Sequence, residues 1–173
     1  MQAWDGWAQA AREGDPVAVT HLVRATQRDV RRLCAHLVSN ADADDLAQET
    51  YERALKALPR FRGDAPVEVW LLGIARRTCM DALRRQTRRR RLIDRLRSQP
   101  TETAPAAVGS SAEDELLAAL SPEGRAAFVL TQLLGLSYAE AATACDVPVG
   151  TIRSRVARAR DELLHAYRQA ETG

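Results

Sequence analysis

The sequence predicts an all-α protein: two small helical domains joined by a flexible linker. Apolar residues recur at helical spacing, and the continuous β-branched runs that indicate strands are lacking. The 173 residues are 46% hydrophobic, which is enough for two small cores. Residues 98–112, SQPTETAPAAVGSSA, are rich in Pro, Ser and Thr, as linkers are. We therefore expect domains at 1–97 and 116–173 and a linker at 98–115.

Hydrophobic periodicity predicts four helices before the linker, at about 3–13, 15–39, 42–58 and 66–92, with a loop at 59–65. The apolar side of the second helix contains Leu22, Val23, Val30, Leu33 and Leu37. The inner side of the third contains Leu46, Thr50, Tyr51, Ala54 and Leu58.

The outer side of the third predicted helix is polar and mostly acidic. It contains Asp45, Gln48, Glu49 and Glu52, at spacings that place all four on one stripe. Such a stripe is either a solvated face or a surface that binds a partner.

The fourth predicted helix is strongly basic. From Arg76 to Arg97 there are ten Arg against two acidic residues, Asp81 and Asp94. Apolar residues at helical steps, beginning at Trp70, precede most of this run. The pattern predicts a hydrophobic anchor followed by contacts to nucleic-acid phosphates. A solvated basic tail would explain Arg88–Arg91 but not the amphipathic stretch before them.

After the linker, the sequence predicts two helices separated by a tight turn. Ser137 and Glu140 form a capping-box pattern in front of an alanine-rich helix. Residues Cys145, Asp146 and Val147 interrupt it, and Pro148 suits the first position of the next helix because that position needs no N–H donor. These features together predict a helix-turn-helix.

The second helix of this motif has one apolar and one basic face. Its predicted core stripe is Val149, Ile152, Val156, Ala159 and Leu163. Its other face carries Thr151, Arg153, Ser154, Arg155, Arg158 and Arg160. A helix of this kind suits the major groove of DNA, with its N-terminal side chains reaching base edges. The alternative is a solvated basic helix on a bundle.

Composition narrows the remaining classes of function. The formal charge is only +2, so nucleic-acid affinity must come from local patches. Three Cys and three His show no ligand spacing, which predicts a reduced protein without metal or cofactor. The N-terminus lacks the pattern of an export signal, and the longest uncharged run is 14 residues. We expect a cytoplasmic protein without membrane insertion.

Three segments together resemble a known family. They are DADDLAQETYERAL (42–55), FRGDAPVEVWLLGIARRTCMDALRR (61–85) and LSPEGRAAFVLTQLLGLSYAEAATACDVPVGTIRSRVARARDEL (120–163). In these segments the chain resembles bacterial RNA polymerase sigma factors of the extracytoplasmic-function (ECF) type, which have only sigma domains 2 and 4.

The resemblance implies a function for each surface. The stripe of Asp45, Gln48, Glu49 and Glu52 would dock on the β′ clamp helices of core RNA polymerase, and the C-terminal domain would sit on the β flap. The promoter −10 element would be read and opened by Phe61, Arg62, Trp70, Arg76, Arg77, Asp81, Arg84 and Arg85, with an extruded base held by the loop from Phe61 to Val69. The helix from Val149 to Arg160 would read the −35 element. An anti-sigma factor is a further candidate partner.

Two positions depart from the family pattern. Arg77 stands where the family usually has Asn, which implies a different base preference at −10. Asp146 stands where the family usually has Gly in the turn, and Asp tolerates left-handed backbone better than most residues.

Two other classes of function are weaker interpretations. An autonomous helix-turn-helix regulator would bind DNA as a dimer and would have little use for two different DNA-facing patches. An enzyme would need clustered acids, metal ligands or an activated nucleophile, and the sequence shows none of these patterns. We therefore expect no catalytic activity.

Overall fold

The structure is a computed structural model that describes residues 4–97 and 112–171. In chain order its elements are α1 (Trp4–Arg12), α2 (Pro16–Leu37), α3 (Ala43–Ala57), the short 3₁₀ turn η1 (Leu58–Arg60), α4 (Val67–Arg97), α5 (Ala112–Ala118), α6 (Pro122–Phe128), the π-helical turn η2 (Val129–Leu133), α7 (Tyr138–Cys145) and α8 (Val149–Glu171). Every element within the described ranges is helical, which confirms the all-α prediction.

The four helices expected before the linker are all present. Asp15 caps α2, because its carboxylate accepts hydrogen bonds from the backbone N–H groups of Val17 (2.8 Å) and Ala18 (3.4 Å). Helix α4 continues to Arg97, beyond the predicted end at 92. Arginine is a good helix former, and no Gly or Pro occurs between Gly73 and Arg97 to stop the helix.

Helix α5 begins at Ala112, inside the range that the sequence assigns to the linker. Acidic residues occupy its first turn, where they favour a helix start, and Leu117 further along is buried. The rest of the predicted linker, 98–111, lies outside the described residues.

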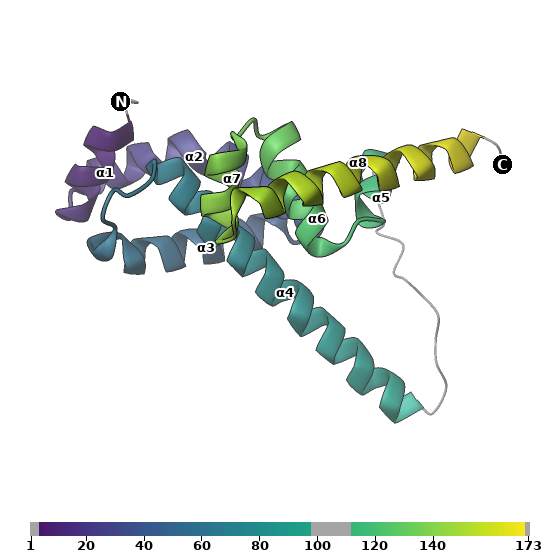
Figure 1. Cartoon of the computed structure of the whole chain (residues 1–173). Helices are drawn as coiled ribbons and strands as arrows, with labels where there is room; N and C mark the ends of the chain where they lie inside the picture. The colour runs from purple at the N-terminus through teal and green to yellow at the C-terminus, as the bar shows by residue number, and fades with distance from the viewer. Residues whose placement is uncertain (1–3, 98–111, 172–173) are drawn as a thin grey trace.

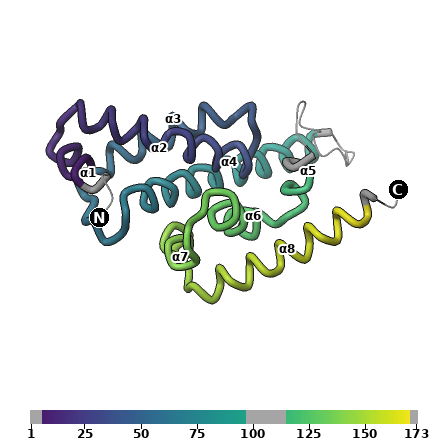
Figure 2. Tube along the Cα trace, turned by 90° about the horizontal axis from the view of Figure 1, so that it is seen from above, coloured from purple at the N-terminus to yellow at the C-terminus, as the bar shows by residue number. Residues whose placement is uncertain are grey.

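Helix α4 lies between the other helices. Figure 2 shows α1–α3 on one side of it and α6–α8 on the other. Its C-terminal half projects from the bundle, and the end of α8 extends away from the bundle in a different direction (Figure 1). The described residues contain no helix that is both long and apolar enough to cross a membrane.

Two hydrophobic cores hold the helices together. The smaller core joins α1, α2, α3 and the start of α4, and includes Leu22, Leu58 and Leu71. The larger core combines residues of α2, α3 and α4, such as Leu33 and Leu72, with residues of α5–α8, such as Leu130 and Ile152. The N-terminal domain (α1–α4) and the C-terminal domain (α5–α8) therefore pack directly on each other.

The helix-turn-helix forms as predicted at its first helix and its turn. The Ser137 hydroxyl accepts from the N–H of Glu140 (3.2 Å), and the Glu140 carboxylate accepts from the N–H of Ser137 (2.8 Å). Asp146 ends α7 in the left-handed region, at φ 54°. Pro148 precedes α8 by one residue, and its carbonyl accepts from the N–H of Thr151 at 2.9 Å.

Candidate nucleic-acid interface

The projecting part of α4 displays a dense row of guanidinium groups. Arg84, Arg85 and Arg88–Arg91 are all exposed. The nearest acidic residue beyond them on the helix is Asp94. A row of exposed arginines on a projecting helix can follow a phosphate backbone, and such contacts do not depend on base sequence.

The row begins at a pocket of about 390 Å³ beside the first half of α4. Its lining includes the guanidinium-bearing Arg53, Arg76, Arg77 and Arg84 and the indole of Trp70. Glu123 of α6 also lines it, so both domains border the pocket. Several cations beside an aromatic ring suit a phosphate or a nucleic-acid base.

Of the two predicted contact residues in the loop before α4, one lies at the surface and the other in the core. Arg62 is exposed and lies 3.3 Å from the Asp64 carboxylate. Phe61, however, is only 9% exposed and packs in the smaller core, with its ring centre 4.9 Å from that of Trp70. In this arrangement the Phe61 ring is covered by the smaller core. Trp70 itself is half-buried.

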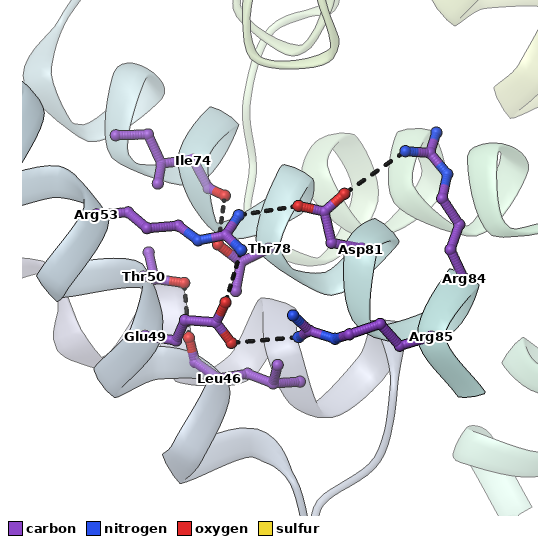
Figure 3. Close-up of polar contacts among 9 residues, drawn as sticks. All are labelled: Leu46, Glu49, Thr50, Arg53, Ile74, Thr78, Asp81, Arg84 and Arg85. Carbon is purple, nitrogen blue, oxygen red and sulfur yellow. Dashed lines mark hydrogen bonds and ion pairs between the residues drawn. The ribbon is translucent and has the colours of Figure 1, made fainter. Parts of the chain in front are cut away.

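An ion-pair network connects α3 to α4 (Figure 3). Arg53 lies 2.6 Å from Glu49 and 3.0 Å from Asp81. The other oxygen of Asp81 faces Arg84 at 3.5 Å, and the other oxygen of Glu49 faces Arg85 at 3.3 Å. The hydrogen bond to Asp81 and the nearby charge of Glu49 raise the pKa of Arg53.

The network includes two of the predicted contact residues. Asp81 was expected in the −10 surface, yet a carboxylate repels phosphate, and both of its oxygens here face arginines. Glu49 was expected on the exposed docking stripe, but it is half-buried with both oxygens paired. In the structure, both carboxylates hold arginine side chains in place.

The rest of the acidic stripe on α3 is open. Asp45, Gln48 and Glu52 are exposed, and the Gln48 amide donates to Glu52 at 3.3 Å. A pocket of about 330 Å³ lies between this stripe and α4, with Asp45 on one wall and Arg89 on the other. The exposed carboxylates can therefore meet a basic partner surface.

Helix α8 buries most of its predicted core stripe and exposes most of its predicted basic face. Ile152, Val156 and Ala159 are buried and Leu163 is half-buried, but Val149 is 39% exposed. Arg153, Ser154, Arg158 and Arg160 are exposed on this helix. The Arg160 guanidinium donates to the Gln132 side chain at 2.6 Å.

Two predicted DNA-binding arginines lie at the junction between the domains. Arg155 of α8 and Arg76 of α4 are half-buried, and each has one buried nitrogen without a hydrogen-bond partner. Burial raises the pKa of the Cys145 thiol, and the positive charges of these same two arginines oppose that rise. Both guanidinium groups therefore lie near the end of α7. Thr151, beside Arg155, is also partly covered.

The contact between the domains is close and includes polar bonds. A Cβ added at Gly73 of α4 would lie 3.2 Å from the backbone oxygen of Ala144 in α7, so only glycine fits without a shift. Arg32 of α2 donates to the carbonyl of Leu133 at 3.1 Å, and Arg125 of α6 donates to the carbonyl of Leu37 at 3.2 Å. Burial lowers the pKa of Arg125.

The cysteines are core residues. Cys34, Cys79 and Cys145 are all free and buried. Contact with the Cys34 thiol and burial raise the pKa of Cys79, so it is a neutral thiol. Among the residues that the structure describes, no cluster of His, Cys, Asp or Glu side chains could hold a metal ion.

Comparison with known proteins assigns both domains. The family model "Sigma-70 region 2" matches residues 22–89, and "Sigma-70, region 4" matches residues 111–163. The chain is 43% identical to the ECF RNA polymerase sigma factor SigC of Mycobacterium tuberculosis over 91% of this chain and 87% of that protein. The chain belongs to the ECF sigma factors. It is also 33% identical to the ECF sigma-E factor of Escherichia coli, over 90% and 89% of the two chains.

Solved structures support the fold of this sigma factor. The sigma factor RpoE of Bartonella quintana, solved with the anti-sigma factor NepR, is 28% identical, with a TM-score of 0.71 over 86% of this chain and 96% of that one. CnrH, solved with the cytosolic domain of CnrY, is 24% identical and shares the fold, with a TM-score of 0.75 over 97% and 99%.

Sequence reasoning missed several polar residues of this sigma factor that connect its parts. Arg53 joins α3 to α4, while Arg32 and Arg125 join the two domains. Arg53 lies four residues after Glu49 on one helix, which is a recognisable pairing signal. The partners of Arg32 and Arg125 lie 101 and 88 residues away, so no local pattern could have identified them.

Proposed function

We propose that this chain is an alternative sigma factor that binds core RNA polymerase, directs it to promoters through the −10 and −35 elements and promotes DNA melting. The observation that carries the proposal is the division of basic surface between the two sigma regions. Most of the arginine row and the α4 side of its pocket lie in the match to region 2, and the exposed face of α8 begins in the match to region 4. Two different DNA-facing surfaces on one chain suit a protein that reads two promoter elements.

The proposal assigns three contact surfaces. The exposed residues of the acidic stripe, Asp45, Gln48 and Glu52, dock on the β′ clamp helices of core polymerase, and the C-terminal domain sits on the β flap. The region 2 surface takes the −10 element: Arg62, Trp70, Arg76 and Arg77 surround the melted bases, and Arg84 and Arg85 contact phosphates. On α8, Thr151, Ser154 and Arg155 read −35 bases, and Arg153, Arg158 and Arg160 contact phosphates.

In this proposal the chain has no catalytic activity of its own and works in the cytoplasm, associated with the nucleoid when bound to polymerase. An anti-sigma factor is a proposed further partner, because the 28% identical RpoE was solved bound to one. Such a partner would keep the sigma factor away from polymerase until a signal releases it.

Run-off transcription with core polymerase tests the proposed function. Core enzyme alone and core enzyme with the chain are compared on a library of genomic fragments, and the start sites are mapped. We expect start sites that depend on the chain and share elements about 10 and 35 base pairs upstream. Specific band shifts by the chain alone, with no transcription after core polymerase is added, would instead indicate an autonomous regulator.

A further inference from the structure

Arg53 is the centre of the ion-pair network between α3 and α4, and sequence reasoning gives it no function. Its two terminal nitrogens contact two carboxylates on different helices, Nη2 with Glu49 and Nη1 with Asp81. Each carboxylate then uses its second oxygen for one further arginine, Arg85 or Arg84. The contacts form one chain in the order Arg84, Asp81, Arg53, Glu49, Arg85 (Figure 3).

From this geometry we propose that Arg53 is a positioning residue for promoter binding, acting through Glu49 and Asp81 on the phosphate-binding Arg84 and Arg85. This inference rests on the proposed function, because it assigns a role within the same DNA-binding surface. Arg53 also belongs to α3, whose exposed stripe is the proposed docking surface. The network thus connects the helix that meets polymerase to the helix that meets DNA.

Charge balance is the first argument for this role. The network contains three arginines and two carboxylates, so it keeps one net positive charge. Without the Arg53 charge, Glu49 and Asp81 would neutralise Arg85 and Arg84 completely. The start of the arginine row would then lose its surplus charge, and the number of phosphate counterions displaced on binding would fall.

Geometry is the second argument. The guanidinium group is a planar fork, and here its two ends bind carboxylates on two helices at 2.6 and 3.0 Å. A lysine carries the same charge at a single point and cannot reproduce both contacts in this arrangement. The side chains are 37% (Arg53), 32% (Glu49) and 42% (Asp81) exposed, and ion pairs as exposed as these add little to folding stability. Positioning is therefore the main effect of the contacts.

The test compares three variants of the full chain with wild type, each assembled with core polymerase on a promoter fragment that wild type transcribes. Arg53→Gln removes the positive charge. Arg53→Lys keeps the charge but lacks the planar guanidinium group with its two contacting nitrogens. Arg31→Gln is the matched control, because Arg31 of α2 forms a similar exposed ion pair with Asp44 of α3, at 2.7 Å. Promoter affinity is measured at several salt concentrations, and thermal unfolding is followed for each chain alone.

We expect Arg53→Gln to weaken promoter binding about tenfold and to make the slope of log affinity against log salt shallower by about 1, the value of one lost phosphate contact. Arg53→Lys should restore the slope but only part of the affinity. Arg31→Gln should match wild type in both. A slope for Arg53→Gln equal to wild type would overturn the inference, whether or not its melting temperature fell.

A double-mutant comparison tests whether Arg53 acts through its carboxylates. The effects of Arg53→Gln and Arg85→Gln on promoter affinity should be non-additive, since the two arginines share Glu49. Arg53→Gln and Arg90→Gln should be additive, and additivity in both pairs would contradict the proposed path. If the proposed function is wrong, the result is different. Core polymerase with the wild-type chain would then bind promoter DNA no better than core polymerase alone, and both proposals would be rejected.

Discussion

Arg76 and Arg155 lie in an unusual environment for residues proposed to contact DNA. Each buries one guanidinium nitrogen without a hydrogen-bond partner. Burying an unpaired polar group costs free energy. Packing between the domains must therefore compensate for the lost solvation of these two nitrogens. The two residues come from different domains and converge near Cys145. Their access to DNA therefore depends on how the domains are arranged.

Replacing Arg155 by Ala should change base preference at one −35 position. If the guanidinium makes a bidentate base contact, its loss costs about 1–3 kcal/mol at the matching base and relaxes discrimination there. Transcription by the holoenzyme from a panel of single-base −35 variants measures the effect. Arg158→Ala is the control, and it should weaken every variant about equally. Wild-type preference at every position in Arg155→Ala would remove the base contact.

Glu68 gives a prediction about pH. Burial raises its pKa, and the nearby carboxylates of Asp29 on α2 and Glu140 on α7 raise it further. A raised pKa in the folded state means that folding disfavours the charged form. The ionised carboxylate therefore lowers stability above the folded pKa, and this loss is relieved as the pH falls through that value.

Glu68→Gln should consequently raise the melting temperature at neutral pH. The gain should shrink as the pH falls through the folded pKa and vanish below the unfolded value of 4.5, where the wild-type side chain is neutral in both states. Thermal unfolding between pH 4 and pH 8 follows the difference. Glu162→Gln, at an exposed site on α8, serves as the control. A gain that does not depend on pH would contradict the electrostatic explanation.

At the scale of elements, helix α8 is oriented by the turn before it. Asp146 adopts φ 54°, and its N–H lies 3.2 Å from the carbonyl of Thr143. Left-handed backbone is unfavourable for residues with a Cβ, least so for Asp and Asn, and free for Gly. The turn thus fixes the angle between α7 and α8 through a single strained residue.

Asp146→Ala should destabilise the protein by about 1 kcal/mol, whereas Asp146→Gly should be neutral or slightly stabilising. Chemical denaturation of both variants and wild type measures the two values. Because both variants lose the carboxylate, their difference isolates the backbone conformation. Equal stabilities would show that the left-handed geometry is not what the position requires.

At the scale of the whole molecule, α4 and α7 hold the two domains together. The contact is close because Gly73 has no side chain where Ala144 approaches. The larger core, which both domains share, includes Leu72 of α4 together with Leu130 and Ile152 of the C-terminal domain. The position of the two proposed DNA-binding surfaces relative to each other is therefore set by packing.

Gly73→Leu should separate the domains while leaving their helices intact, because the new side chain would occupy space now filled by backbone of α7. We expect a larger radius of gyration in small-angle scattering and an almost unchanged helical circular dichroism signal. Gly150→Leu is the control, since a Cβ there meets no atom within 4 Å. An unchanged radius in Gly73→Leu would mean that the interface adapts without opening.

Local sequence patterns were sufficient to predict the helices and most residues of the candidate nucleic-acid interface. The capping box of Ser137 and Glu140 fixes a helix start through bonds between neighbouring residues, and it appears in the structure as the sequence predicted. Most of the buried and exposed positions of α3 and α8 follow helical periodicity, which is also local. The arginine row needs only an uninterrupted helix, and the sequence supplies one.

The sequence by itself determined the helical class, the capping box, the left-handed turn and the basic character of α4 and α8. Only the tertiary structure decided that Phe61 belongs to the core, that Arg155 is half-buried and that Glu49 and Asp81 hold arginines. The reason is physical: capping and periodicity depend on residues a few positions apart. Burial and ion pairing depend instead on which distant surfaces meet, and only the packing of α4 on α7 shows why Gly73 faces the backbone of Ala144.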